Sequence, residues 1–211
     1  MQLPPHISPA LVIGIGCLCL TVWATRVTIR MRGYPAGIQL LTIPQYLIGQ
    51  LREDMASGGL PALSWVFFSI WSVGVSGLHF WGVIYGIYTA IGWWDLMTHA
   101  MGGFGVAGIL ALMTRKSTRE YPSWLIPGVF AIGAGFEVYE FLFKSFWHHW
   151  SLQFYITDTI VDLIINTSGA VVVVIAVVTY ARVGEDELSS RTELSDTESK
   201  TVDSTTSSRF R

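Results

Sequence analysis

Five long apolar stretches, separated by short polar segments, make up most of this 211-residue chain. They cover residues 9–25, 60–88, 95–114, 124–143 and 156–182. A helix needs roughly 20 apolar residues to cross a bilayer, and all but the first, slightly shorter stretch reach that length. The pattern therefore predicts an all-α integral membrane helical bundle.

A sixth, weaker stretch covers residues 38–51 and is interrupted by Pro44 and by glutamines at 39, 45 and 50. It is too short and too polar for an ordinary crossing. We expect an interfacial or re-entrant helix here, with a short sixth span as the alternative. The bundle then has five to six transmembrane helices.

The composition changes at Gly184, where Ser, Thr, Glu and Asp replace the apolar residues. Such a segment cannot bury enough apolar surface to offset the entropy of ordering the chain. We therefore expect a polytopic transmembrane domain at residues 1–183. Residues 184–211 should form a disordered, acidic, Ser/Thr-rich cytoplasmic tail.

Charged residues are scarce and unevenly placed. They make up 13% of the chain, about half the share that is usual in soluble domains, so the lipid bilayer is the expected partner. The net charge of −2 offers no basic surface for nucleic acid. Basic residues follow the first and third stretches: Arg26, Arg30, Arg32, Arg115, Lys116 and Arg119. The positive-inside rule then predicts a multi-pass cell-membrane protein with its N-terminus outside and its C-terminal tail in the cytoplasm.

Polar residues recur at one end of three of the apolar stretches, at helical spacing. With five spans, all three of these ends lie on the outer side of the membrane. Residues four apart share a helix face, and residues three apart lie on the same side. The residues concerned are Asp95 and His99, Glu137 and Glu140, and Asp158, Asp162 and Asn166. The topology therefore predicts that three helices bring these side chains together.

The energetic cost of these acids argues for a role. A charged side chain at the centre of a span costs roughly 2.5–3.5 kcal/mol on insertion scales, and less near its ends. No Lys or Arg lies inside the three segments, and only Lys144 is close by. The excess negative charge must be met by protons, bound cations or water, which usually marks a site or a pathway.

Structural explanations for the same residues stay open. Asp95 could simply begin a helix, where the helix dipole favours an acid, with His99 bonded to it. Glu137 and Glu140 could form a hydrogen-bonded pair between helices. Asp158 could cap its helix, with the other polar side chains of that stretch serving packing.

Glycines and histidines outside the acidic pattern have simpler interpretations. Gly102, Gly103 and Gly105 are typical of close helix packing around a site. His79 is expected to be a hydrogen-bonded packing residue. His148 and His149 lie in an aromatic loop and are expected to be interfacial.

Three short patterns also resemble a known family. They are Trp-Trp-Asp-x-x-x-His at 93–99, Glu-x-x-Glu-Phe at 137–141 and Asp-x-x-x-Asp-x-x-x-Asn-x-x-Gly at 158–169. In these the chain resembles the YjdF-like family of uncharacterised polytopic membrane proteins, and it is more distantly similar to VanZ-like proteins. Leu96 stands where both groups usually carry Lys or Arg. The resemblance implies a membrane protein with a shared polar core and no particular reaction.

The leading functional hypothesis is a cation- or metal-dependent membrane enzyme acting on a lipid-linked or amphipathic substrate. The expected cation ligands or acid–base groups are Asp95, His99, Glu137, Asp158 and Asp162, with Glu140 and Asn166 behind them. Oxygen ligands suit Mg²⁺ or Mn²⁺, and the histidine also allows Zn²⁺ or Fe²⁺. The alternatives are a proton- or cation-coupled transporter, and a structural or partner-binding membrane protein.

Overall fold

The computed structural model describes residues 9–35, 40–144 and 150–208, without the side chains of 9, 40, 116, 117 and 184 onward. The chain divides into two units, Met1–Val174 and Ile175–Arg211. The first unit holds every predicted site residue. The second contains only the continuation of the last helix in its described part. His148 and His149 lie outside the described residues, and the disorder expected for 184–211 stays a prediction.

The described chain is helical and contains no strand. Its long helices are α1 (Pro9–Arg30), α3 (Gly59–Ile84), α5 (Trp94–Met113), α7 (Leu125–Phe143) and α8 (Leu152–Ser208). Within the described residues, five helical segments are long and apolar enough to cross a membrane, the last ending at Val183. Each overlaps one of the five stretches predicted from the sequence, which confirms the all-α membrane bundle.

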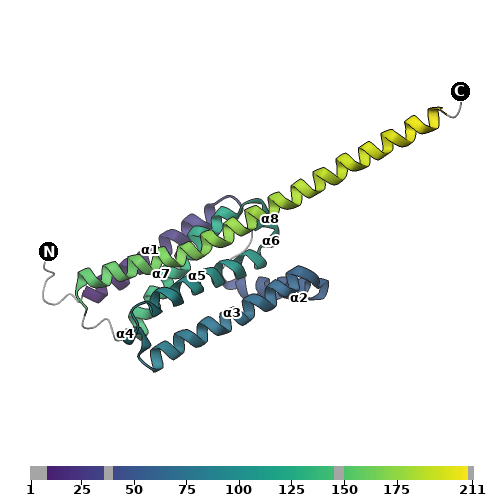
Figure 1. Ribbon diagram of the computed structural model, residues 1–211. Helices are drawn as coiled ribbons and strands as arrows, with labels where there is room; N and C mark the ends of the chain where they lie inside the picture. Colours follow the sequence, from purple (N-terminus) through teal and green to yellow (C-terminus); the bar gives the residue numbers. More distant parts are fainter. Residues whose placement is uncertain (1–8, 36–39, 145–149, 209–211) are drawn as a thin grey trace. The chain divides into compact units, whose positions relative to one another are not determined.

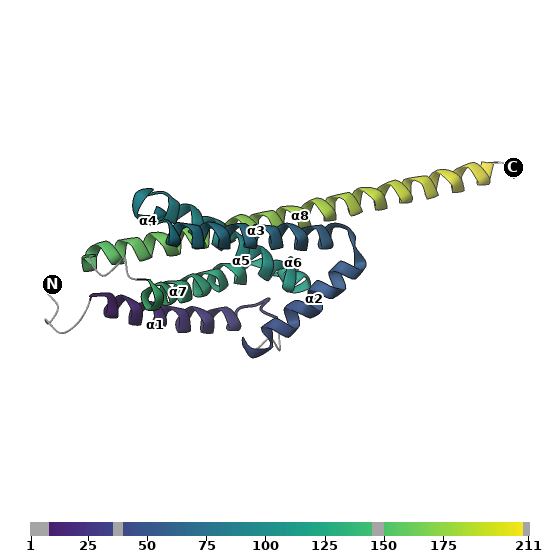
Figure 2. The same ribbon diagram turned by 90° about the horizontal axis from the view of Figure 1, so that it is seen from below.

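The segment around residues 38–51 forms a short 3₁₀ turn, η1 (Leu40–Thr42), and the helix α2 (Ile43–Ser57). This helix is not among the five candidate spans. Two glycines with left-handed backbone, Gly58 (φ 68°) and Gly59 (φ 67°), reverse the chain into α3. Figure 2 shows α2 inclined at the end of α3, which favours five spans over six.

The second span is shorter than the sequence suggested. We expected one tilted helix over residues 60–88, but α3 ends at Ile84. Gly86 takes a left-handed conformation (φ 65°) and begins the one-turn helix α4 (Ile87–Ala90). This break turns the chain back, so that Tyr88 reaches α3 and α5 through its hydroxyl.

Glycine contacts hold the central helices close together. A Cβ placed on Gly103 of α5 would collide with the backbone of Asn166 in α8, and one on Gly169 with the backbone of Phe104. A Cβ on Gly105 would meet the ring of Trp71. The predicted role of the α5 glycines in close packing is confirmed for 103 and 105. Figure 1 and Figure 2 show α5 beside α7, with α3 on its other side.

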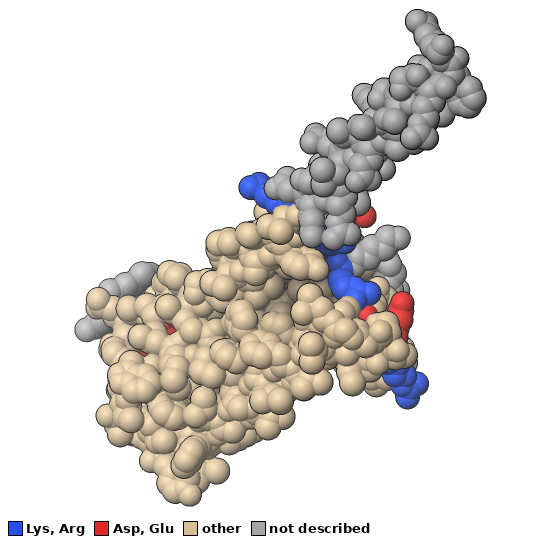
Figure 3. Space-filling view, turned by 45° about the vertical axis from the view of Figure 1, so that its right-hand side comes forward, with Lys and Arg blue, Asp and Glu red and all other residues tan. Residues whose placement is uncertain are grey.

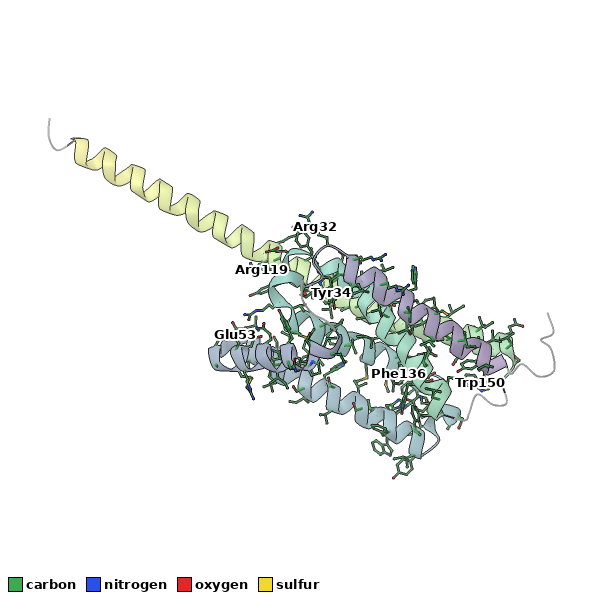
Figure 4. The ribbon with its side chains drawn as sticks, turned by 180° about the vertical axis from the view of Figure 1, so that it is seen from behind. Arg32, Tyr34, Glu53, Arg119, Phe136 and Trp150 are labelled. Atoms are coloured by element: carbon green, nitrogen blue, oxygen red, sulfur yellow. The ribbon has the colours of Figure 1, made fainter. Side chains whose placement is uncertain are left out.

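The two ends of the first unit differ in charge. Figure 3 shows a largely uncharged surface with Lys and Arg gathered towards one end. Figure 4 places Arg32, Arg119 and Glu53 at that end and Trp150 at the opposite end, with Phe136 towards Trp150. The charged end also contains α6 (Arg115–Glu120) and the 3₁₀ turn η2 (Pro122–Trp124).

Candidate functional site

Three helices bring all seven predicted residues into one cluster, which we call the carboxylate–histidine cluster. Asp95 and His99 come from the first two turns of α5, Glu137 and Glu140 from the last two turns of α7, and Asp158, Asp162 and Asn166 from the first half of α8. Helical spacing explains the pattern, since each group lies on one side of its helix. The convergence predicted from the topology is confirmed.

His99 lies at the centre of the cluster. Its Nε2 atom is 3.4 Å from Oδ1 of Asp95 and 3.7 Å from Oδ2 of Asp162. Its Nδ1 atom is 2.9 Å from Nδ2 of Asn166. The ring of Phe136 packs edge-on against the imidazole, with centroids 5.7 Å apart. Because the distances to both aspartates exceed an ordinary hydrogen bond, Nε2 faces two carboxylates without being tightly bonded to either.

Two carboxylates of the cluster are buried with unsatisfied oxygens. Asp162 is 1% exposed and Glu137 is 2% exposed. Neither oxygen of Asp162, nor Oε1 of Glu137, has a hydrogen-bond partner among the described residues. The other oxygen of Glu137 lies 3.4 Å from Oγ1 of Thr159. Leaving a buried carboxylate oxygen unsatisfied costs about 1–3 kcal/mol or more, so this arrangement suits a group that binds there.

Glu140 has a different environment. It is buried and forms an ion pair with the buried side chain of Lys144, one turn further along the chain. The Lys144 ammonium also lies over the ring of Tyr88, 4.7 Å from its centroid. The sequence contained the signal for this pair, since acid and base are four residues apart. Lys144 therefore offsets one of the five negative charges.

Donor atoms of the cluster lie close enough together to share a cation. Three overlapping groups each offer one ligand atom per residue within 4.8 Å of one another. They are Asp95, His99 and Glu140; His99, Glu137 and Asp162; and Asp95, Asp158 and Asp162. His99, Glu137 and Asp162 are all buried. The combination of several carboxylates with one imidazole suits Mg²⁺, Mn²⁺, Fe²⁺ or Zn²⁺.

A cavity of about 440 Å³ adjoins the cluster. Its walls come from α3, α5 and α7, with Asn166 of α8 at one point, and most of the lining is apolar. The lining residues with polar side chains are Ser76, His79, Thr98, His99, Tyr139 and Asn166. The cavity is thus a largely apolar space that has the central histidine of the cluster in its wall.

Sequence reasoning missed a hydrogen-bonded chain beside this cavity. The Tyr88 hydroxyl lies 2.8 Å from Nδ1 of His79 and 3.4 Å from Oγ1 of Thr98. Thr98 in turn donates to the backbone carbonyl of Asp95. Burial raises the pKa of the Tyr88 phenol, so the hydroxyl keeps its proton. The expected hydrogen bond of His79 is confirmed, but its partner depends on the break after α3, which no local pattern indicated.

Sequence reasoning also missed a second buried acid at the charged end. Asp54 of α2 is completely buried. Its oxygens accept hydrogen bonds from Trp65 Nε1 at 2.9 Å and Gln50 Nε2 at 3.1 Å. Arg115 Nη1 lies 3.2 Å from the same carboxylate. Unlike Asp162, this aspartate is fully partnered.

Fold and cluster together define a polytopic α-helical membrane protein with buried carboxylate and histidine groups. The chain belongs to a family described as predicted membrane protein (DUF2238), whose pattern matches residues 59–183. The YjdF-like family is part of this group, which confirms that resemblance, while the link to VanZ-like proteins stays a prediction. No curated protein and no solved structure matches the chain.

Proposed function

We propose that the carboxylate–histidine cluster binds a divalent cation and that the protein is a membrane enzyme acting on a lipid-linked or amphipathic substrate. The observation that carries this proposal is the pair of buried, unsatisfied carboxylates, Asp162 and Glu137, next to Nε2 of His99. A cation would replace the missing hydrogen bonds and offset charges that lipid does not tolerate. Asp95 and Asp158 would complete the ligands.

Asn166 supports this assignment through the histidine. As placed, its Nδ2 donates to Nδ1 of His99, which leaves the proton of a neutral ring on Nε2. Rotating the amide by half a turn offers its oxygen to Nδ1–H instead and leaves the Nε2 lone pair for a cation. Metal-ligating histidines usually donate their other N–H to such an oxygen. Asn166 can therefore serve both states of the ring.

The distribution of ionisable residues favours an enzyme over a transporter. A proton or cation relay needs acids or histidines at successive depths of the membrane. Residues 100–113 of α5, 125–136 of α7 and 163–181 of α8 contain no Asp, Glu, Lys, Arg or His. Within these three membrane spans the acids lie at one end of each, which fits a local site next to a cavity.

The charged end supports the orientation predicted from the sequence. The arginines lie away from the cluster in sequence and fold: Arg30 at the end of α1, Arg32 after it, Arg52 on α2, and Arg115 and Arg119 on α6. By the positive-inside rule, this end faces the cytoplasm and the cluster faces the outer side. A fluorescent protein fused to the C-terminus should then fold and fluoresce in the cytoplasm. A dark fusion, produced in normal amount and inserted, would reverse this orientation.

The direct test is the metal content of detergent-purified, full-length protein by elemental mass spectrometry. Wild type should retain about one divalent cation per chain through gel filtration. The Asp95→Asn/His99→Ala variant should retain none while keeping its helical circular dichroism. If both proteins are free of metal and equally stable, the cation site is wrong. Proton flux in liposomes, with Glu137→Gln as the variant, then becomes the measurement of choice.

A further inference from the structure

We propose that the cavity beside the cluster binds the hydrocarbon chain of a single-chain membrane lipid, whose polar head lies against His99 and Asn166. This inference rests on the proposed function and names the class of substrate for that site. Ligand pockets usually measure roughly 300–1,000 Å³ and combine apolar walls with a few polar groups at one place. The cavity, at about 440 Å³, has this size and this distribution of side chains.

The walls of the cavity suit a hydrocarbon chain. Val75 and Phe80 of α3, Val106 of α5, and Val129 and Ile132 of α7 all line it. None of these side chains carries a hydrogen-bonding atom, so only apolar matter fits there without loss of hydrogen bonds. Figure 4 shows Phe136, another lining residue, projecting among the side chains between the helices.

The mouth of the cavity opens towards lipid rather than water. Phe80 of α3 and Ile132 of α7 line the cavity and are exposed, so the cavity is open to the surroundings beside these apolar residues. Only 6% of the membrane-crossing window of α3 is buried, so most of this apolar helix is left uncovered by the rest of the described bundle. An opening beside the apolar helix α3, within a span, admits a lipid chain sideways from the bilayer.

The polar end of the cavity determines where the head of the lipid lies. His99 and Asn166 contribute to the lining and are also members of the cluster. Without a cation, the carboxylates repel an anionic head. With a cation bound, its charge attracts a phosphate or carboxylate, as Mg²⁺ commonly does through substrate oxygens. Cation loading should therefore control which heads are accepted, but not whether the chain enters.

Photo-crosslinking tests this proposal on the full-length protein in lipid nanodiscs. The probes are hexadecanol and hexadecyl phosphate, each carrying a diazirine in the chain. Labels should concentrate on the cavity residues of α3, α5 and α7. Ile132→Trp, at the mouth, should lower labelling about tenfold, and Val106→Trp, inside, should act in the same direction. Ile70→Trp is the matched control, because Ile70 is exposed on α3 and does not line the cavity.

Three outcomes would overturn the proposal. Labels spread evenly over the lipid-facing helices would mean ordinary boundary lipid. Equal labelling of Ile132→Trp and Ile70→Trp would mean that the hydrocarbon chain does not enter between these helices. Absence of cavity labelling in wild type, as expected if a second copy of the protein covers the mouth, would overturn the proposal as well. A chelator separates this inference from the proposed function. If the chelator abolishes labelling by hexadecyl phosphate but not by hexadecanol, both the lipid site and the cation site are supported. If the chelator changes the labelling by neither probe, the lipid site stands and only the proposed cation is contradicted.

Discussion

Asp54 and Asp162 are both almost completely buried, yet their surroundings are opposite. The carboxylate of Asp54 accepts hydrogen bonds from Trp65 and Gln50 and pairs with Arg115. That of Asp162 has no hydrogen-bond partner within the described chain and faces His99 at 3.7 Å. Burial of an acid is therefore not in itself a sign of function. The sign is a buried acid that the protein leaves unsatisfied, because such a group costs stability unless something else binds it.

The largest expected effect is a difference in metal content between variants of the two aspartates. Asp162→Asn keeps the shape of the side chain but removes the charge that would bind a cation, so retained metal should fall more than about tenfold. Asp54→Asn is the matched control and should retain the metal of wild type. Elemental mass spectrometry of both purified variants checks this. Equal metal content in the two variants would contradict the assignment of Asp162.

Substitutions of the two aspartates should also have different effects on the free energy of unfolding. In chelator, Asp162→Asn should be as stable as wild type or more so, because it removes a buried, unsatisfied carboxylate. Asp54→Ala should lower the free energy of unfolding by about 2–3 kcal/mol, since it leaves Trp65 Nε1 without its charged acceptor. Unfolding in mixed micelles measures both. If Asp162→Asn were less stable than wild type, the cluster would serve helix packing alone.

The packing that supports the cluster gives a somewhat smaller effect. Gly103→Ala would place a methyl group against the backbone of Asn166, which cannot move without separating α5 from α8. Overpacking of this kind costs about 1–3 kcal/mol, and metal retention should fall with it. Gly77→Ala is the control, because a Cβ there meets no atom within 4 Å. If both variants behave alike in thermal unfolding and metal content, the close crossing does not support the cluster.

The sequence predicted one of the two acidic regions and not the other, for a physical reason. Asp95, Glu137 and Asp162 lie in apolar stretches, where a charge stands out against lipid, and helical spacing aligns them. Asp54 follows Glu53 and Arg52 in a segment that resembles an ordinary polar helix face. Its partners, Trp65 and Arg115, come from other helices. Local patterns therefore gave no indication of its burial.

The parts of the candidate site that escaped prediction also depend on tertiary structure. The five spans follow from length and hydropathy, and the convergence of their acids follows from topology. The position of Tyr88 depends on the break at Gly86, and a glycine alone does not say whether a helix ends there. The cavity depends on how α3 lies across α5 and α7, which hydropathy does not determine.

The smallest expected effect dissects the satisfied aspartate itself. Asp54 accepts hydrogen bonds from two neutral donors, Trp65 and Gln50, and pairs with the cationic Arg115. The two neutral side chains are buried or half-buried, whereas the Arg115 side chain is 48% exposed. Solvent screens an exposed ion pair, so Arg115→Ala should cost less than about 1 kcal/mol. Trp65→Phe, which removes the buried donor at nearly constant shape, should cost more.

The order of these two variants decides what satisfies a buried acid in this protein. If Trp65→Phe exceeds Arg115→Ala in unfolding experiments, and 1 M salt changes neither difference, hydrogen bonds hold Asp54 in place. The absence of such donors at Asp162 then becomes the distinguishing feature of the cluster. If Arg115→Ala lowers the stability more than Trp65→Phe does, and salt changes its effect, then the ion pair rather than the hydrogen bonds distinguishes Asp54 from Asp162. The cation proposed for Asp162 would in that case do for one end of the protein what Arg115 does for the other.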